Sequence, residues 1–94
     1  MKLEQGSRPR LAARAKLRRD HRTGEQVLLY PEKGLLLNAT SAAIALRCTG
    51  ELTVGEIAVQ LGQEFGEADV ARLEREVLDF LGSLAERGLL AEPA

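Results

Sequence analysis

The chain has 94 residues, which is enough for one small domain with a single hydrophobic core but too few for a deep enclosed pocket as well. Aromatic residues make up only 3% of it, so the core has to be built from aliphatic side chains. One cysteine cannot form an intramolecular disulfide, and no apolar segment reaches the length of a membrane span. The composition therefore predicts a soluble cytoplasmic protein.

Charge is distributed unevenly along the chain, although the net charge is only −1. Residues 1–22 hold eight basic and two acidic side chains, whereas residues 51–94 hold ten acidic and three basic ones. Such a polarised layout bears on which partners a protein attracts rather than on which fold it adopts.

The beginning of the chain lacks hydrophobic periodicity. Its first ten residues, MKLEQGSRPR, contain Gly, Ser and Pro but no apolar repeat. We therefore expect a flexible N-terminal arm over residues 1–12 and a single domain over residues 13–91.

Three short apolar runs predict three strands. In chain order they are AKLRRD (15–20), QVLLYP (26–31) and GLLLN (34–38). Pro31 fixes φ and Gly34 tolerates positive φ, so the sequence PEKG favours a hairpin connection between the second and third strands.

Helix signals follow the third strand. Asn38 or Thr40 can cap a helix over residues 39–48, and Gly50 is expected to end it. Side chains of this kind accept hydrogen bonds from the free backbone N–H groups of the first helical turn.

Two further helices are expected in the second half of the chain. Thr53 and Glu56 have the spacing of a capping box, and the apolar residues after them recur at helical intervals. The last helix, over residues 67–87, carries one long apolar stripe: Val70, Leu73, Val77, Phe80, Leu81 and Leu84. Three antiparallel strands followed by three helices form an α+β fold with a winged-helix-like layout.

The third predicted strand raises a question, because no further strand follows it to cover its edge. Soluble proteins usually protect such edges with charges or proline, yet Leu35, Leu36 and Leu37 provide neither. By strand alternation, Leu35 and Leu37 share one face and Leu36 takes the other.

A second stripe runs along the last helix, roughly 80–140° from the centre of the first. It contains Ala71, Leu78, Gly82 and Ala85. One interpretation is a wide buried face. The other is a shallow groove rimmed by Leu78 and Arg75, in which a peptide paired with the strand edge could lay its side chains by β-augmentation.

Catalytic and metal chemistry find little support in the residue types present. Cys48 is expected to be a buried small residue and His21 a solvated loop residue. One cysteine and one histidine cannot make a protein-only zinc site without several carboxylates. We expect no enzyme activity, no metal and no cofactor.

The winged-helix layout raises DNA binding as an alternative function, because the second helix of that fold reads the major groove. Here the helix after Thr53 carries Glu56 and Glu64 and no basic residue. A surface that meets phosphates should be basic, so the charges argue against nucleic acid as a partner.

The order and spacing of four segments are similar to those of a known family. The segments are KLRRD, VLLYPEKGLLLN, SAAIALRCTGELTVGEIAVQL and EVLDFLGSLAERGLL. Between residues 15 and 90 the chain resembles the PqqD family. A Leu-Leu-x-Pro-Glu turn, a Leu-Asn strand end and a Thr-Val-x-x-Ile helix start carry most of the match (Leu28, Leu29, Pro31, Glu32, Leu37, Asn38, Thr53, Val54 and Ile57).

One position departs from the family pattern. The family commonly has Asp-Gly where this chain has Thr49-Gly50. A role for an acid at that corner is therefore not carried over, although a threonine can still support the turn.

The resemblance implies a peptide chaperone of pyrroloquinoline quinone biosynthesis. Such a protein binds the ribosomal precursor peptide PqqA as an added strand and presents it to PqqE, a radical S-adenosylmethionine enzyme. The expected peptide-binding residues are those of the third strand and the second stripe: Leu35, Leu36, Leu37, Asn38, Ala71, Arg75, Leu78 and Ala85. The same open edge could pair two copies into a homodimer. An adaptor that binds only the enzyme, without peptide, is a third interpretation.

Overall fold

Three antiparallel strands form the sheet of this protein. The computed structural model describes residues 2–30 and 33–91. Within them, β1 (Lys16–Arg19), β2 (Gln26–Tyr30) and β3 (Lys33–Leu37) are arranged in the order β1-β2-β3. Because each strand pairs with its neighbour in sequence, β3 ends as an edge strand. The predicted hairpin connection includes Pro31 and Glu32, which lie outside the described residues.

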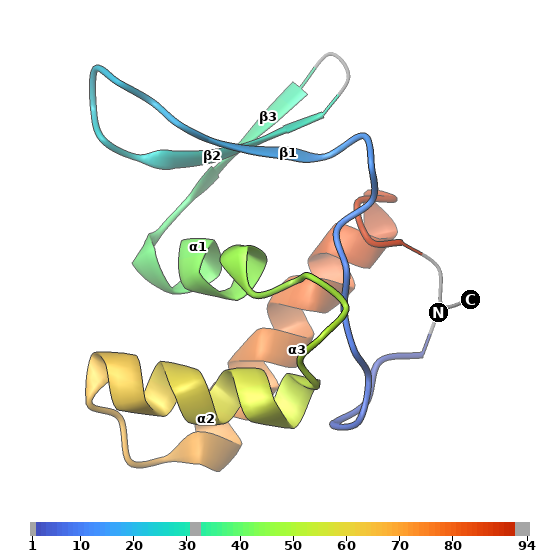
Figure 1. The fold of residues 1–94 in the computed structure, drawn as a ribbon, viewed down its shortest axis with the longest axis vertical. Helices are drawn as coiled ribbons and strands as arrows, with labels where there is room; N and C mark the ends of the chain where they lie inside the picture. Colours follow the sequence, from blue (N-terminus) through green and yellow to red (C-terminus); the bar gives the residue numbers. More distant parts are fainter. Residues whose placement is uncertain (1, 31–32, 92–94) are drawn as a thin grey trace.

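Three helices follow the sheet: α1 (Ala39–Leu46), α2 (Val54–Phe65) and α3 (Val70–Glu86). Figure 1 shows α1 between the sheet and α2, while α3 passes α2 and rises toward the sheet. The predicted α+β fold of three strands and then three helices is confirmed. The winged-helix likeness describes this layout and carries no function by itself.

Aliphatic side chains from every layer fill the core. The central strand contributes Leu28 and α1 contributes Ile44, both of them buried. The predicted stripe of α3 contributes four inward-facing residues: Leu73, Val77, Leu81 and Leu84. Val70 and Phe80, at the margins of the stripe, are only partly buried.

Side-chain caps fix where the helices begin. The Asn38 carboxamide oxygen accepts from the Ser41 N–H at 2.8 Å, which confirms it as the cap of α1. The predicted capping box of α2 is also present. The Thr53 hydroxyl accepts from the Glu56 N–H at 3.1 Å, and the Glu56 carboxylate accepts from the Thr53 N–H at 2.8 Å. Hydrogen bonding of the Glu56 carboxylate to Thr53, first to its backbone N–H and then to its side chain, lowers the pKa of Glu56.

Two helix boundaries differ from the prediction. The last helix begins at Val70 instead of residue 67, because Asp69 caps it by accepting from the Arg72 N–H at 3.0 Å. The first helix ends at Leu46, before the predicted residue 48. Gly50 has a φ of 85° but lies in the turn beyond that end, so it does not cap the helix.

The N-terminal segment departs from the expected flexible arm. Its backbone carbonyls at Gln5 and Ser7 accept from the N–H groups of Gly55 and Val54, at 3.0 and 2.8 Å. Those donors belong to the first turn of α2, where a helix has no internal partners for them. Further bonds continue to Ala12, whose N–H donates to the Leu89 carbonyl at 2.8 Å. Backbone pairing of this kind needs no apolar periodicity, so the sequence pattern did not indicate it.

Candidate functional site

The outer edge of β3 presents free backbone groups. The register pairs Tyr30 with Lys33 across the hairpin, and bonded and non-bonded pairs alternate along an antiparallel ladder. Leu35 and Leu37 therefore bond back to β2, whereas Gly34 and Leu36 direct their N–H and C=O groups away from the sheet. Among the described residues, no backbone group outside the sheet bonds to either of them. This edge can accept a further strand.

The side chains of β3 alternate as the sequence predicts. Leu37 is buried and Leu35 is half-buried against the core, while Leu36 on the opposite face keeps 64% of its surface exposed. Asn38 follows the strand, and its side chain is committed to the cap of α1. Its contribution to this edge is to end the strand and turn the chain into the helix.

The second stripe of α3 changes from exposed to half-buried along its length. Ala71 and Arg75 are exposed, whereas Leu78 and Ala85 pack partly against the core. Between them, a Cβ added at Gly82 would meet nothing within 4 Å. The stripe is therefore a shallow open surface with an apolar floor toward its C-terminal half.

The C-terminal half of α3 lies closer to the sheet than its beginning does (Figure 1). Arg87, just beyond the helix, donates from Nη1 to the Tyr30 hydroxyl at the end of β2 over 3.4 Å. Ala85 lies two residues before this contact, whereas Leu78 lies near the middle of α3. Ala71 sits in the first turn, at the far end of α3, and is not brought near β3.

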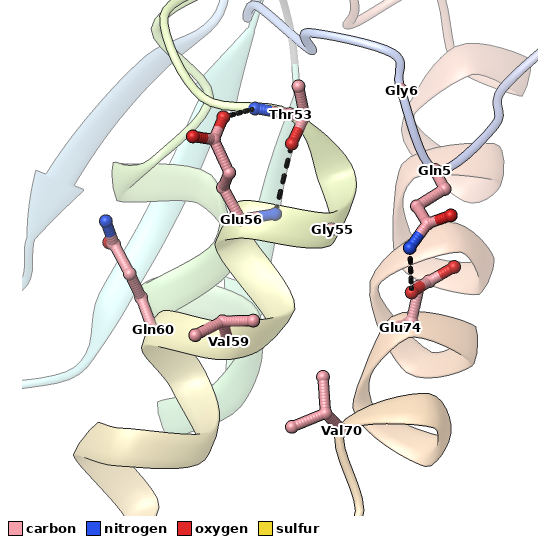
Figure 2. Close-up of a pocket in the computed structure, with 9 residues that line it drawn as sticks. All are labelled: Gln5, Gly6, Thr53, Gly55, Glu56, Val59, Gln60, Val70 and Glu74. Atoms are coloured by element: carbon pink, nitrogen blue, oxygen red, sulfur yellow. Dashed lines mark hydrogen bonds between the residues drawn. The ribbon is translucent and has the colours of Figure 1, made fainter.

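A different hollow, of about 620 Å³, opens where α2, the start of α3 and the N-terminal segment meet (Figure 2). Sequence reasoning missed it because the N-terminal segment was expected to be free. Its polar side chains largely bond to one another: Gln5 Nε2 donates to the Glu74 carboxylate at 3.3 Å, and Glu56 is held by the capping box. Its lining residues are Gln5, Gly6, Thr53, Gly55, Glu56, Val59, Gln60, Val70 and Glu74.

The remaining reactive side chain is the Cys48 thiol, which is buried as predicted. Its Sγ donates to the Ile44 carbonyl at 3.2 Å. Desolvation by burial raises its pKa to about 12, so it stays a protonated thiol near neutral pH and is a poor nucleophile. Across residues 2–30 and 33–91, no three metal-binding side chains gather into a cluster. No helix in that part of the chain is long and apolar enough to cross a membrane.

The corner at Thr49 and Gly50 keeps a turn without an acid. The Thr49 hydroxyl accepts from the Glu51 N–H at 3.4 Å, and Gly50 adopts the positive φ that the turn requires. The expectation that threonine supports this corner is confirmed.

Comparison with known proteins places this geometry in a family. The family model described as "Coenzyme PQQ synthesis protein D (PqqD)" matches residues 25–90. The chain belongs to the PqqD family. A relative from Xanthomonas axonopodis pv. citri (strain 306), named "PqqA binding protein", is 34% identical over 84 residues. That match covers 89% of this chain and 90% of the relative.

Solved structures with the same fold include a PqqD domain. The solution NMR structure of the PqqD truncation of Methylobacterium extorquens PqqCD, described as a stand-alone recognition element for ribosomally synthesised peptides, has a TM-score of 0.83. It is 33% identical and covers 97% of this chain and 96% of that one. A lasso peptide synthetase B1 complexed with its leader peptide has a TM-score of 0.74 over 92% of this chain and 100% of that one. At 24% identity, it shows the shared fold alone.

Proposed function

We propose that this protein binds the precursor peptide PqqA as an additional strand on β3 and presents it to PqqE in pyrroloquinoline quinone biosynthesis. The observation that carries the proposal is the free edge of β3, where Gly34 and Leu36 direct backbone donors and acceptors outward. Membership of the PqqD family and a relative named "PqqA binding protein" support it.

Backbone pairing supplies part of the affinity in this mechanism. Each ladder bond contributes about 0.5–1.5 kcal/mol net, because an equivalent bond to water is given up. The incoming peptide is unstructured before it binds, so its ordering cost offsets part of that gain. We expect a moderate affinity.

Side-chain contacts supply the specificity, since backbone pairing is nearly blind to sequence. Peptide residues that share the face of Leu35 would point toward α3 and meet Leu78, Ala85 and the open surface at Gly82. Asn38 would position the end of the strand, while Ala71 and Arg75 would contact only a peptide that extends along the whole helix. The protein acts by binding, and the chemistry belongs to the enzyme.

The same edge offers a competing use. Two copies could pair through β3 and thereby cover the peptide site. A homodimer of this kind would bind peptide only after dissociating, so apparent peptide affinity would fall as protein concentration rises.

Titration of the isotope-labelled protein with PqqA tests the proposal. Binding at the β3 edge should move the backbone amide signals of residues 34–38 and of α3 between Leu78 and Ala85. Saturable shifts confined to other regions would overturn the proposed site. A spectrum that stays unchanged well above micromolar peptide would overturn the proposed function.

A further inference from the structure

The outward face of the sheet carries an apolar patch that the peptide edge does not account for. We call Val27, Leu29 and Leu36 the outer patch. Leu36 pairs directly with Val27, and Leu29 lies diagonally beside Leu36 because it pairs with Gly34. Leu36 is 64% exposed and Leu29 is 42% exposed. Single exposed leucines are ordinary, but a contiguous apolar cluster on one face is typical of an interaction surface.

Gly34 makes the outer patch continuous across the two strands. A Cβ added there would lie 3.3 Å from Leu29 Cδ2 and 3.4 Å from Val27 Cγ1. The two neighbouring side chains therefore cover the position that a side chain on residue 34 would occupy.

Positive charge borders the outer patch. On the same face, Lys16 pairs with Leu29 and Arg18 pairs with Val27, and both basic side chains are exposed. Within the described part of the chain, Arg18 Nη1 donates only to the adjacent Leu17 carbonyl, at 3.3 Å, and no ion pair uses either Lys16 or Arg18. The three strands contain four basic residues and no acidic one.

We infer that the outer patch, with Lys16 and Arg18, docks the enzyme that receives the peptide, through an enzyme surface on which carboxylates border apolar side chains. This inference rests on the proposed function. A strand added to β3 leaves the outward face open and extends it by one strand, so an enzyme seated there would touch Leu36 and the bound peptide together. The recognition and the handover of the peptide would then use adjoining surfaces.

A second copy of this chain fits the outer patch poorly. A two-fold contact would bring Lys16 and Arg18 of one copy toward the same basic residues of the other. Three side chains also fall short of the roughly 800 Å² per partner that stable interfaces bury. An acidic partner would avoid the repulsion between basic residues. A peptide bound at β3 would enlarge the surface that this partner can contact.

The test uses Leu29→Ser with Leu46→Ser as its matched control. Leu29 lies on the central strand, away from the free edge, and Leu46 is a leucine on α1 that is 57% exposed outside the patch. Affinity for PqqA and affinity of the peptide-loaded protein for purified PqqE are measured separately by calorimetry. We expect Leu29→Ser to weaken PqqE binding about tenfold and to leave PqqA binding unchanged. Leu46→Ser should match the wild type in both.

Each result separates this inference from the proposed function. Wild-type PqqE affinity in Leu29→Ser, or no PqqE binding by the peptide-loaded wild type, overturns the docking surface while peptide binding stands. Failure of the wild type to bind PqqA overturns the proposed function itself. A second variant, Lys16→Glu with Arg18→Glu, should slow association with PqqE and reduce its salt dependence. An unchanged association rate would contradict the electrostatic part.

Discussion

Arg87 Nη1 lies 3.4 Å from the hydroxyl of Tyr30, a residue 57 positions earlier in the chain. The contact links the end of α3 to the hairpin end of β2, next to the start of β3. It therefore holds the C-terminal end of α3, where the half-buried Ala85 lies, close to the sheet.

Replacing Leu36 with proline tests the strand-edge mechanism. Leu36→Pro removes one outward N–H from β3, and proline is tolerated at this position because an edge N–H has no partner within the sheet. We expect PqqA binding to be lost while the folded amide spectrum is kept. Leu36→Thr, which retains the N–H and suits a strand, should keep measurable binding. Wild-type affinity in a folded Leu36→Pro variant would contradict strand addition.

Two substitutions test the open surface at Gly82 on α3. Gly82→Ala should raise the free energy of unfolding by about 0.5–1 kcal/mol, because alanine favours a helix interior and its Cβ meets nothing within 4 Å. Gly82→Phe should fill the open surface and weaken PqqA binding by about tenfold or more. Denaturant titration and calorimetry provide the two measurements. Equal PqqA affinities for both variants would place the peptide elsewhere.

The same glycine-to-alanine change should have the opposite effect in α2. A Cβ added at Gly62 would lie 2.9 Å from the backbone carbonyl oxygen of Glu67, which cannot move without disturbing the turn before α3. We expect Gly62→Ala to lower the free energy of unfolding by about 1–3 kcal/mol. Urea denaturation of Gly62→Ala and Gly82→Ala, each against the wild type, checks that the two changes in the free energy of unfolding have opposite signs. A stabilised Gly62→Ala variant would contradict the close approach.

The capping box of α2 should make stability depend on pH. The hydrogen bonds from Thr53 lower the pKa of Glu56 below its ordinary 4.5, so the folded state favours the carboxylate. The contribution of the ionised Glu56 side chain to the free energy of unfolding is complete above that ordinary pKa. It is lost as the pH falls through the lower folded-state pKa. The stability advantage of the wild type over Glu56→Gln should therefore shrink in acid. Urea denaturation of both proteins, from neutral pH to below pH 4.5, measures this difference in the free energy of unfolding. A difference that does not change with pH would contradict the prediction.

Local patterns were sufficient for most of the fold. The apolar spacing of α3 identified Val77 and Leu84 as core residues, and the Thr53–Glu56 spacing identified the start of α2. Alternation along β3 predicted that Leu36 would face away from Leu35 and Leu37. Each of these properties depends on backbone periodicity or on a cap within one turn, so neighbouring residues determine it.

The candidate site was only partly accessible to the same reasoning. Ala71 and Leu78 belong to one stripe in the sequence, yet only the C-terminal half of α3 lies toward the sheet, as the Arg87–Tyr30 contact indicates. The angle at which α3 crosses the other elements decides which half of the helix lies near the sheet. Helical periodicity contains no information about that angle.

The sequence by itself determined the order of the elements, the buried faces of the helices and the unprotected character of the third strand. Only the tertiary structure decided where the N-terminal segment lies, because its carbonyls bond to the first turn of α2 almost fifty residues later. It also decided that Leu29 and Leu36 share one outer patch, since that depends on the register between two strands. Periodicity fixes the face of a single element, whereas long-range hydrogen bonding and packing fix which faces meet.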